Sequence, residues 1–183
     1  MRTIRPMEDR YLLPSLDLIE QVFTEHENAR EGATVRRLVE EIRAKKYYTP
    51  ALELIMVDDA DQILGYAMFS RFHIEDRYED ELLLLSPVAV RTAYQRQHIS
   101  RDILEHGFEA ARRMGFRAVM VEGNPANYRS RGFRPSHLSG VVAGPGLHLP
   151  HPDCLMLKEL VPGALEGIRG QVDYSFYDTL REE

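Results

Sequence analysis

The residues with the clearest chemical potential follow the most apolar stretch of the chain. The segment Leu82–Val90 is apolar on both faces, and a polar loop, Arg91–His98, leads from it directly into a helical pattern. A loop that enters a helix presents backbone N–H groups and the positive end of the helix dipole, which together bind phosphate. Arg91, Arg96 and Arg101 add positive charge at the same end. The spacing predicts a phosphate site, with a purely structural strand–helix junction as the alternative.

Other reactive side chains form no arrangement that predicts a site. Cys154 is the single cysteine, so it excludes an intramolecular disulfide, and no histidine–acid pairing accompanies it. We interpret it as a buried packing residue rather than a nucleophile. His148 and His151 have the spacing of a metal pair, but a zinc site needs further ligands. No metal is expected.

The elements that must position the loop alternate between strand and helix patterns. Leu82–Val90 and Arg117–Val121 are apolar strands, and between them lies a helix over Ile99–Met114 that Gly115 ends. This unit has the length of a crossover, so the two strands are predicted to be parallel. Pro87 lacks a ladder donor, which indicates a bulge or a gap in the pairing of the first strand.

The N-terminal part of the chain is predicted to hold two helices and a hairpin. Helical periodicity covers about Leu12–Phe23, and a second amphipathic helix follows a break at Gly32, with Thr34 as its N-cap. Two runs of strand-forming residues, Leu52–Val57 and Ile63–Phe69, flank a short acidic turn. That pattern is typical of an antiparallel hairpin.

The length of 183 residues suits a single domain, and we expect one mixed α/β domain over residues 1–183. The composition, 44% hydrophobic and 28% charged, is that of a globular protein. A net charge of −6 argues against non-specific nucleic-acid binding. The N-terminus lacks the apolar core of a secretion signal, and the apolar runs are too short to span a bilayer. A cytoplasmic protein with neither a nucleic-acid nor a membrane partner is therefore expected.

Three segments resemble the GNAT superfamily of N-acetyltransferases, and within it the YhbS-type branch. These segments are Ser86–Ser100, Gly115–Val121 and Gly123–Phe133. Gly65–Ser70 and Lys158–Leu165 match more loosely, so the resemblance extends over most of the chain. It implies a GNAT-like α/β domain, in which a mixed central sheet with splayed parallel strands is flanked by helices.

The resemblance also implies acetyl-CoA as the co-substrate, held where the two parallel strands splay apart. The pantetheine arm would pair with the backbone of Val88, Ala89 and Val90. Asn124 would lie on the far side of the cleft, and the diphosphate would bind the loop that corresponds to the family motif Q/R-x-x-G-x-G/A. The residues of that loop are Gln95, Arg96, Gln97, His98, Ile99 and Ser100.

The loop departs from the family motif at two positions. His98 stands where the first glycine is usual, and Ser100 replaces the second small residue. Glycine adopts a positive φ without strain and lets the backbone approach phosphate closely. A histidine in that conformation costs ~1–2 kcal/mol. We therefore predict that CoA binds, but more weakly than with glycine at both positions.

Acyl transfer requires a proton donor for the thiolate and a proton acceptor for the amine. The resemblance places Tyr128, in its Y-x-x-x-G-F context, as the general acid, whereas the residues alone favour a packing role beside Phe133. Glu122 is the candidate base that we favour. Glu81, Glu75 and ordered water are the alternatives.

The leading prediction is an enzyme that moves an acetyl group from acetyl-CoA to a primary amine by direct attack in a ternary complex. The acceptor is a small molecule or a peptide N-terminus, and Tyr47–Tyr48 and Arg71–His73 are the expected acceptor side. The alternative is a non-catalytic acyl-CoA-binding or regulatory module, motivated by the altered loop. Tyr174 and Tyr177 are expected either in the core or at the edge of a homodimer.

Overall fold

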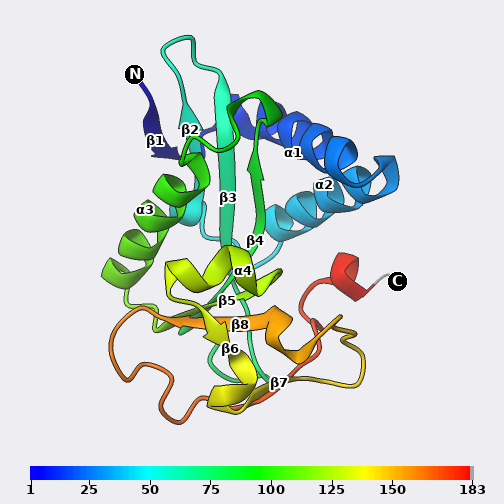
Figure 1. Ribbon diagram of the computed structural model, residues 1–183, viewed down its shortest axis with the longest axis vertical. Coiled ribbons are helices and arrows are strands. Elements are labelled where there is room, and N and C mark those ends of the chain that lie inside the picture. Colours follow the sequence, from blue (N-terminus) through cyan, green and yellow to red (C-terminus); the bar gives the residue numbers. More distant parts are fainter. Residues whose placement is uncertain (182–183) are drawn as a thin grey trace. The chain divides into compact units, whose positions relative to one another are not determined.

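The computed structural model describes residues 1–181, which form two compact units that interleave along the chain. The first unit consists of Met1–Ser70 and Ser86–Ala110, and the second of Arg71–Leu85 and the chain from Ala111 onward. Strand β4 (Leu82–Val90) and helix α3 (Ile99–Arg113), both labelled in Figure 1, each have residues in both units.

The strands of the first unit form the predicted hairpin and one further edge strand. β1 (Thr3–Pro6) pairs antiparallel with β2 (Glu53–Val57), and β2 pairs antiparallel with β3 (Ile63–Arg71). The next strand in the order is β4 (Leu82–Val90). The antiparallel hairpin that the sequence predicted is thereby confirmed.

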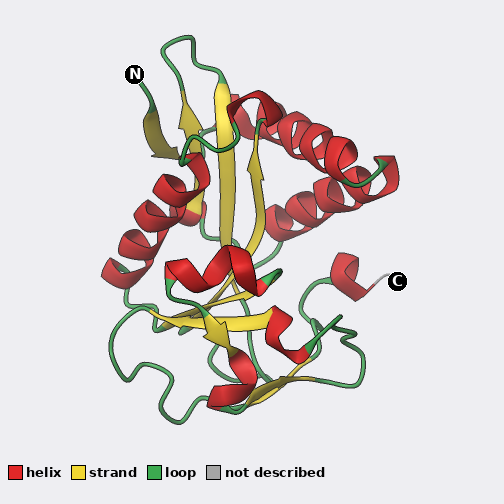
Figure 2. Cartoon of the chain, viewed as in Figure 1, coloured by secondary structure: helices red, strands yellow, loops and turns green. Residues whose placement is uncertain are grey.

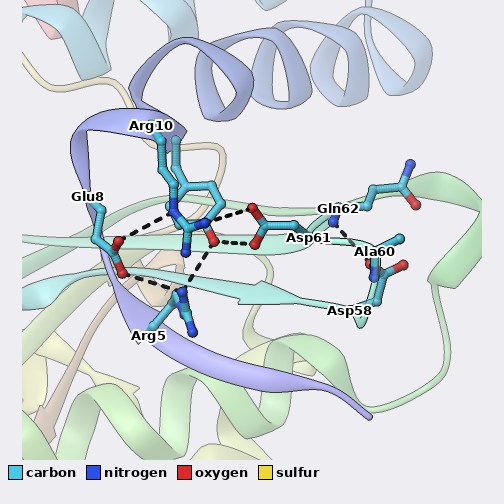
Figure 3. A network of polar contacts seen from close by, with 8 residues as sticks. Arg5, Glu8, Arg10, Asp58, Ala60, Asp61 and Gln62 are labelled. Atoms are coloured by element: carbon cyan, nitrogen blue, oxygen red, sulfur yellow. Dashed lines mark hydrogen bonds and ion pairs between the residues drawn. The ribbon is translucent and has the colours of Figure 1, made fainter.

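The turn of this hairpin is fixed by the start of the first helix (Figure 3). Asp58 accepts two backbone N–H groups of the turn, at 2.9 and 3.0 Å, and Asp61 adopts a positive φ of 62°. The Tyr11 hydroxyl donates to Asp61, and Nη1 of Arg10 lies 3.1 Å from the same carboxylate. These contacts attach the N-terminal segment to the tip of the hairpin.

Two helices, α1 (Leu12–His26) and α2 (Ala29–Ala44), pack against each other in the first unit. The prediction that α2 follows a break at Gly32 with Thr34 as its N-cap is wrong. Asn28 is the N-cap, and its side chain accepts the Glu31 N–H at 2.9 Å.

Gly32 lies inside α2 for a packing reason. A Cβ at this position would stand 2.1 Å from Oγ1 of Thr24 and 2.7 Å from the carbonyl oxygen of Glu20, both on α1. The absence of a side chain therefore permits the close approach of the two helices, and the glycine is no helix break.

The buried face of α2 carries an ion pair to strand β2. Glu53 is fully buried, and its carboxylate receives Nη2 of Arg43 at 2.9 Å, the Tyr48 hydroxyl at 2.6 Å and the Tyr66 hydroxyl. Nη2 of Arg43 also donates to Ser15 of α1 at 2.8 Å. Burial and the adjacent Glu53 raise the pKa of both tyrosines. The Arg43–Glu53 ion pair thus joins both helices to the sheet.

The second unit contains the parallel pair that the crossover predicted. β4 pairs parallel with β5 (Ala118–Glu122) over Leu82–Leu84, and β4 continues beyond this register to Val90. β5 pairs antiparallel with β8 (Leu155–Glu159), which pairs antiparallel with β6 (Arg134–Pro135). The parallel arrangement is confirmed.

The remaining elements are short except for the crossover helix. This helix is α3 (Ile99–Arg113), and α4 (Pro125–Tyr128) follows β5. β7 (Val141–Ala143) pairs parallel with β9 (Gly170–Val172) in a separate two-stranded sheet. Short 3-10 helices lie at Asp9–Tyr11, Pro50–Leu52, Thr92–Tyr94, Arg129–Arg131, Ser136–Ser139, Pro152–Cys154 and Asp178–Arg181.

Helices and strands together make the mixed α/β fold that the sequence predicted (Figure 2). Across residues 1–181, none of the helices has the length and apolar character needed to cross a membrane.

Candidate active site

The loop predicted to bind phosphate begins at the end of β4 in the first unit. The backbone N–H of Arg91 donates to the Leu64 carbonyl at 2.9 Å, and Nε of Arg91 donates to the Ile63 carbonyl at 3.0 Å. Arg91 thus fastens the end of β4 to β3. The sequence counted it among the charges that attract phosphate, but its Nε–H serves the backbone of β3.

Left-handed backbone conformation occurs at alternate residues of the turn before α3. Arg96 has φ +61° and His98 has φ +64°, so both adopt the left-handed conformation. The positive φ expected at His98 is confirmed. Alternation of this kind turns successive N–H groups toward one concave side, an arrangement that binds anions. The Asp102 N–H donates to the His98 carbonyl at 3.0 Å, so His98 is the last residue before the helix.

Two side chains of the loop, those of Gln95 and Gln97, contact residues from other parts of the chain. Nε2 of Gln95 lies 2.8 Å from Nε2 of His26 at the end of α1, and Oε1 of Gln97 accepts a hydrogen bond from Arg2. The loop therefore offers an anion its backbone N–H groups rather than these amides.

A third contact holds the start of the loop. The Thr92 hydroxyl donates to Glu25 of α1, and this hydrogen bond lowers the pKa of the Glu25 carboxyl. Side-chain contacts from α1 thus fix the loop at Thr92 and at Gln95.

The start of α3 is placed by a glycine on β3. A Cβ on Gly65 would lie 2.5 Å from Ile99 and 2.9 Å from Ile103, so only glycine lets these buried side chains pack onto β3. On the neighbouring β4, Ala89 is buried, whereas Val88 is half-buried. The packing of Ile99 and Ile103 against Gly65 thus places the start of α3 next to β3.

The second unit holds the residues predicted for catalysis, at the end of β5 and in the segment that follows it. The Gly123 N–H donates to the Cys154 carbonyl at 2.9 Å. The Asn124 side chain accepts the Ala126 N–H at 3.0 Å, which caps α4. Asn124, predicted to contact the cofactor, therefore also begins the short helix that carries Tyr128.

Tyr128 is a half-buried side chain with an available hydroxyl. Its ring meets Phe133 edge to face, with centroids 5.5 Å apart, and a Cβ on Gly123 would lie 2.9 Å from the ring. Among residues 1–181 the hydroxyl has no hydrogen-bond partner. Burial raises the pKa of Tyr128 above 10.0, while Arg131 acts in the opposite sense. The phenol therefore stays protonated at neutral pH, as a proton donor must.

Glu122 is the last residue of β5, and it is exposed. Its Oε2 accepts a hydrogen bond from the Tyr174 hydroxyl at 2.8 Å. Burial, and next the carboxylate of Glu122, raise the pKa of Tyr174 well above 10.0. The sequence left Tyr174 between core and dimer edge, and it contains no local signal for a contact between residues 52 positions apart.

The alternative bases have structural partners. Glu81 lies 3.0 Å from Nη1 of Arg117 in an ion pair. A Cβ on Gly170 would stand 2.2 Å from the Glu75 carboxylate, so Glu75 packs against that backbone. Glu122 is the candidate that stands at a strand end beside the Tyr128 segment.

The expected acceptor residues are engaged in contacts within their own units. The Tyr48 hydroxyl donates to buried Glu53. Nδ1 of His73 accepts the Asp76 N–H at 3.2 Å, and its ring meets Phe176. These contacts assign both side chains a structural role.

Asp153 contacts two histidines near Cys154, one through its carboxylate and the other through its backbone N–H. Asp153 lies 2.7 Å from Nε2 of His137, and the Asp153 N–H donates to Nδ1 of His151 at 3.1 Å. This hydrogen bond from His137 lowers the pKa of Asp153. Within the described residues no group of three or more side chains is arranged to hold a metal ion.

The chain is similar in sequence to known proteins. The chain is 29% identical over 146 residues to the uncharacterized N-acetyltransferase YhbS of Escherichia coli K12, which covers 79% of this chain and 83% of that protein. It is 28% identical over 134 residues to the uncharacterized N-acetyltransferase YjhQ of the same strain. This match covers 72% of this chain and 71% of that protein.

Solved structures share the fold. The structure of the Escherichia coli GNAT family N-acetyltransferase YhbS in complex with CoA has a TM-score of 0.81 at 22% identity, covering 93% of this chain and 87% of that one. A GNAT family acetyltransferase from Brucella melitensis in complex with acetyl-CoA has a TM-score of 0.63 at 28% identity, covering 73% and 83%.

The family model described as "Acetyltransferase (GNAT) family" matches residues 17–134, which is more than half of the chain. This stretch includes the loop before α3 and the segment from Glu122 to Phe133. The chain therefore belongs to the acetyltransferase (GNAT) family.

Proposed function

We propose that this chain transfers an acetyl group from acetyl-CoA to a primary amine, by direct attack of the amine in a ternary complex. The acceptor is a small-molecule amine or a peptide N-terminus. Family membership and the CoA and acetyl-CoA complexes of structural relatives support the co-substrate. The observation that carries the proposal is the alternating left-handed turn at Arg96 and His98, which opens onto the start of α3.

The first unit is proposed to hold the co-substrate. The backbone N–H groups from Arg96 to Ser100 would surround the diphosphate, with the α3 dipole adding to the attraction. The pantetheine arm would pair with the backbone of Val88, Ala89 and Val90, where β4 extends beyond its register with β5. Hydrogen bonds to main chain would give affinity without demanding particular side chains.

The second unit is proposed to move the protons. A neutral amine forms the new bond to the thioester carbonyl carbon, and the carbon–sulfur bond breaks. Tyr128, protonated and without a hydrogen-bond partner among residues 1–181, would give its proton to the departing thiolate. Glu122 would take the proton that the attacking amine loses. A strand N–H of Val88 or Ala89 is proposed to stabilise the negative carbonyl oxygen.

A non-catalytic acyl-CoA-binding or regulatory module is the second candidate. It is favoured by His98, which brings a side chain to a position where the family has glycine. Both candidates predict CoA binding, and only the enzyme predicts thiol release that depends on an amine.

The test measures free thiol from acetyl-CoA with a panel of primary amines and peptide N-termini. We expect Tyr128→Phe to lower kcat about 10²-fold or more, with little change in the KM for acetyl-CoA, because the hydroxyl acts after binding. Tyr78→Phe is the control, since the Tyr78 hydroxyl donates to the Gly167 carbonyl, and it should keep the wild-type rate. CoA binding without thiol release for any amine would support the regulatory module instead.

A further inference from the structure

The hydrogen bond between Tyr174 and Glu122 joins a residue outside the stretch that the family model matches to a residue inside it. Glu122 lies within residues 17–134, the part that the family model matches, and Tyr174 lies outside it. Their oxygen atoms are 2.8 Å apart. The exposed carboxylate proposed as the base is thus held by a residue from the C-terminal segment.

Tyr174 is itself held firmly in place. The residue is 4% exposed, and its ring meets Phe176 edge to face, with centroids 5.9 Å apart. The residue adopts φ +55°, a conformation unfavourable for a bulky side chain. Asp173 closes the turn by accepting the Ser175 N–H at 2.9 Å, and the Tyr177 N–H donates to the Tyr174 carbonyl at 3.1 Å.

The neighbouring aromatic residues anchor this turn within the second unit. Phe176 packs on Phe72 and on His73, with centroids 5.6 and 5.2 Å apart. The Tyr177 hydroxyl donates to the Arg71 carbonyl at 3.1 Å. A hydroxyl mounted on such a support has little freedom, so the position of the Glu122 carboxylate is restricted too.

The other end of the contact is equally rigid. Glu122 closes the register of β5 with β8, where it stands opposite Leu155. The N–H of the next residue, Gly123, donates to the Cys154 carbonyl, and a Cβ at this position would lie 2.9 Å from the Tyr128 ring. The proposed acid and the proposed base are therefore carried by one short, fixed segment.

We propose that Tyr174 is a positioning residue for the acetyl transfer: its hydroxyl orients the Glu122 carboxylate to take the proton from the attacking amine. This inference rests on the proposed function. The tyrosine keeps its own proton throughout, consistent with the raised pKa that burial gives it. The amine proton passes to Glu122, and the thiolate receives its proton from Tyr128.

The experiment is a double-mutant cycle on the full chain, with the most active amine of the panel as acceptor. Tyr174→Phe should lower kcat about 10-fold and leave the KM for acetyl-CoA unchanged, and Glu122→Gln should lower kcat about 10²-fold, the range of general-base effects. Tyr174→Phe with Glu122→Gln should match Glu122→Gln alone, because the hydroxyl acts only through the carboxylate.

Tyr177→Phe is the matched control, since it removes another buried hydroxyl from the same turn, one that donates to a backbone carbonyl. It should keep kcat within about two-fold, because its partner is no catalytic group. Thermal unfolding midpoints of all variants set an assay temperature at which each is folded. The ring of Tyr174 remains in the phenylalanine variant, and exposed Glu122 can be hydrated, so folding is expected.

Each result decides the matter. A wild-type kcat in Tyr174→Phe overturns the positioning role, and so does a further loss of the same size in the Glu122→Gln background. A comparable loss in Tyr177→Phe overturns it as well, since the effect is then that of a loosened turn. Absence of thiol release by the wild-type chain with every amine contradicts the proposed function itself, a different outcome from all of these.

Discussion

At the scale of single residues, the loop before α3 shows how backbone conformation and side-chain identity conflict. Arg96 and His98 both adopt positive φ, where glycine alone is unstrained. The energetic cost falls on the same residues whose N–H groups are proposed to hold the diphosphate. Binding strength and local strain are thus set at one position, His98, and a substitution there should change both.

We predict that His98→Gly tightens CoA binding about 5- to 10-fold and raises the free energy of unfolding by up to ~1 kcal/mol, because the left-handed strain is removed. Isothermal titration and urea unfolding measure the two effects. His98→Ala is the control: it removes the imidazole but keeps the Cβ and the strain, so stability should not rise. An unchanged dissociation constant in His98→Gly contradicts this role of the position.

A second prediction concerns Tyr128 and the dependence of kcat on pH. A general acid works in its protonated form, so its contribution is present below its pKa and is lost as pH rises through it. Because burial raises the pKa of Tyr128 above 10.0, kcat should not decline on the basic side until above pH 10.0. The measurement is the pH profile of kcat with a saturating amine. A decline that begins near neutrality and survives in Tyr128→Phe would exclude this residue as its source.

At the scale of elements, the sequence predicted what depends on local pattern. The β2–β3 hairpin and the parallel β4–β5 pair followed from runs of strand-forming residues and from the length of the crossover. The beginning of α2 was misplaced, because glycine signals a helix break in sequence and a close helix contact in space. The Glu122–Tyr174 contact was missed because no periodicity links a strand end to a distant turn.

Gly32 gives a prediction at the scale of elements. The sign of the stability change in Gly32→Ala distinguishes a glycine that breaks a helix from one that permits a close helix contact. In an exposed helix, Gly→Ala stabilises by up to about 1 kcal/mol. At position 32 the new Cβ meets Thr24 and the backbone of α1, so Gly32→Ala should destabilise by about 1–3 kcal/mol. Urea unfolding provides the measurement. A gain in stability would show that the α1–α2 contact is looser than described.

The buried carboxylate of Glu53 on β2 gives another prediction at the scale of elements. Arg43→Met leaves Glu53 buried without its cation, which should cost about 3–5 kcal/mol of unfolding free energy. Arg36→Met on the same helix is the matched control. Arg36 pairs with exposed Asp17 and half-buried Glu20, so its loss should cost no more than about 1 kcal/mol. Equal losses in chemical denaturation would refute the central place of the buried pair.

At the scale of the whole molecule, the loop before α3 belongs to the first unit, whereas Tyr128, Glu122 and the turn at Tyr174 belong to the second. The family and the mixed α/β fold were predicted from the sequence and are confirmed. The acceptor was not predictable from the fold, since one architecture serves many substrates and specificity resides in individual side chains.

The most direct test of the account is the release of thiol from acetyl-CoA by the wild-type chain, followed with and without each amine of the panel. Direct attack predicts no thiol without an amine, and with a suitable amine one N-acetyl product for every thiol released. Thiol released in a burst before any amine is added would indicate a covalent acetyl-enzyme. That burst, or the absence of product with every amine, would contradict the account.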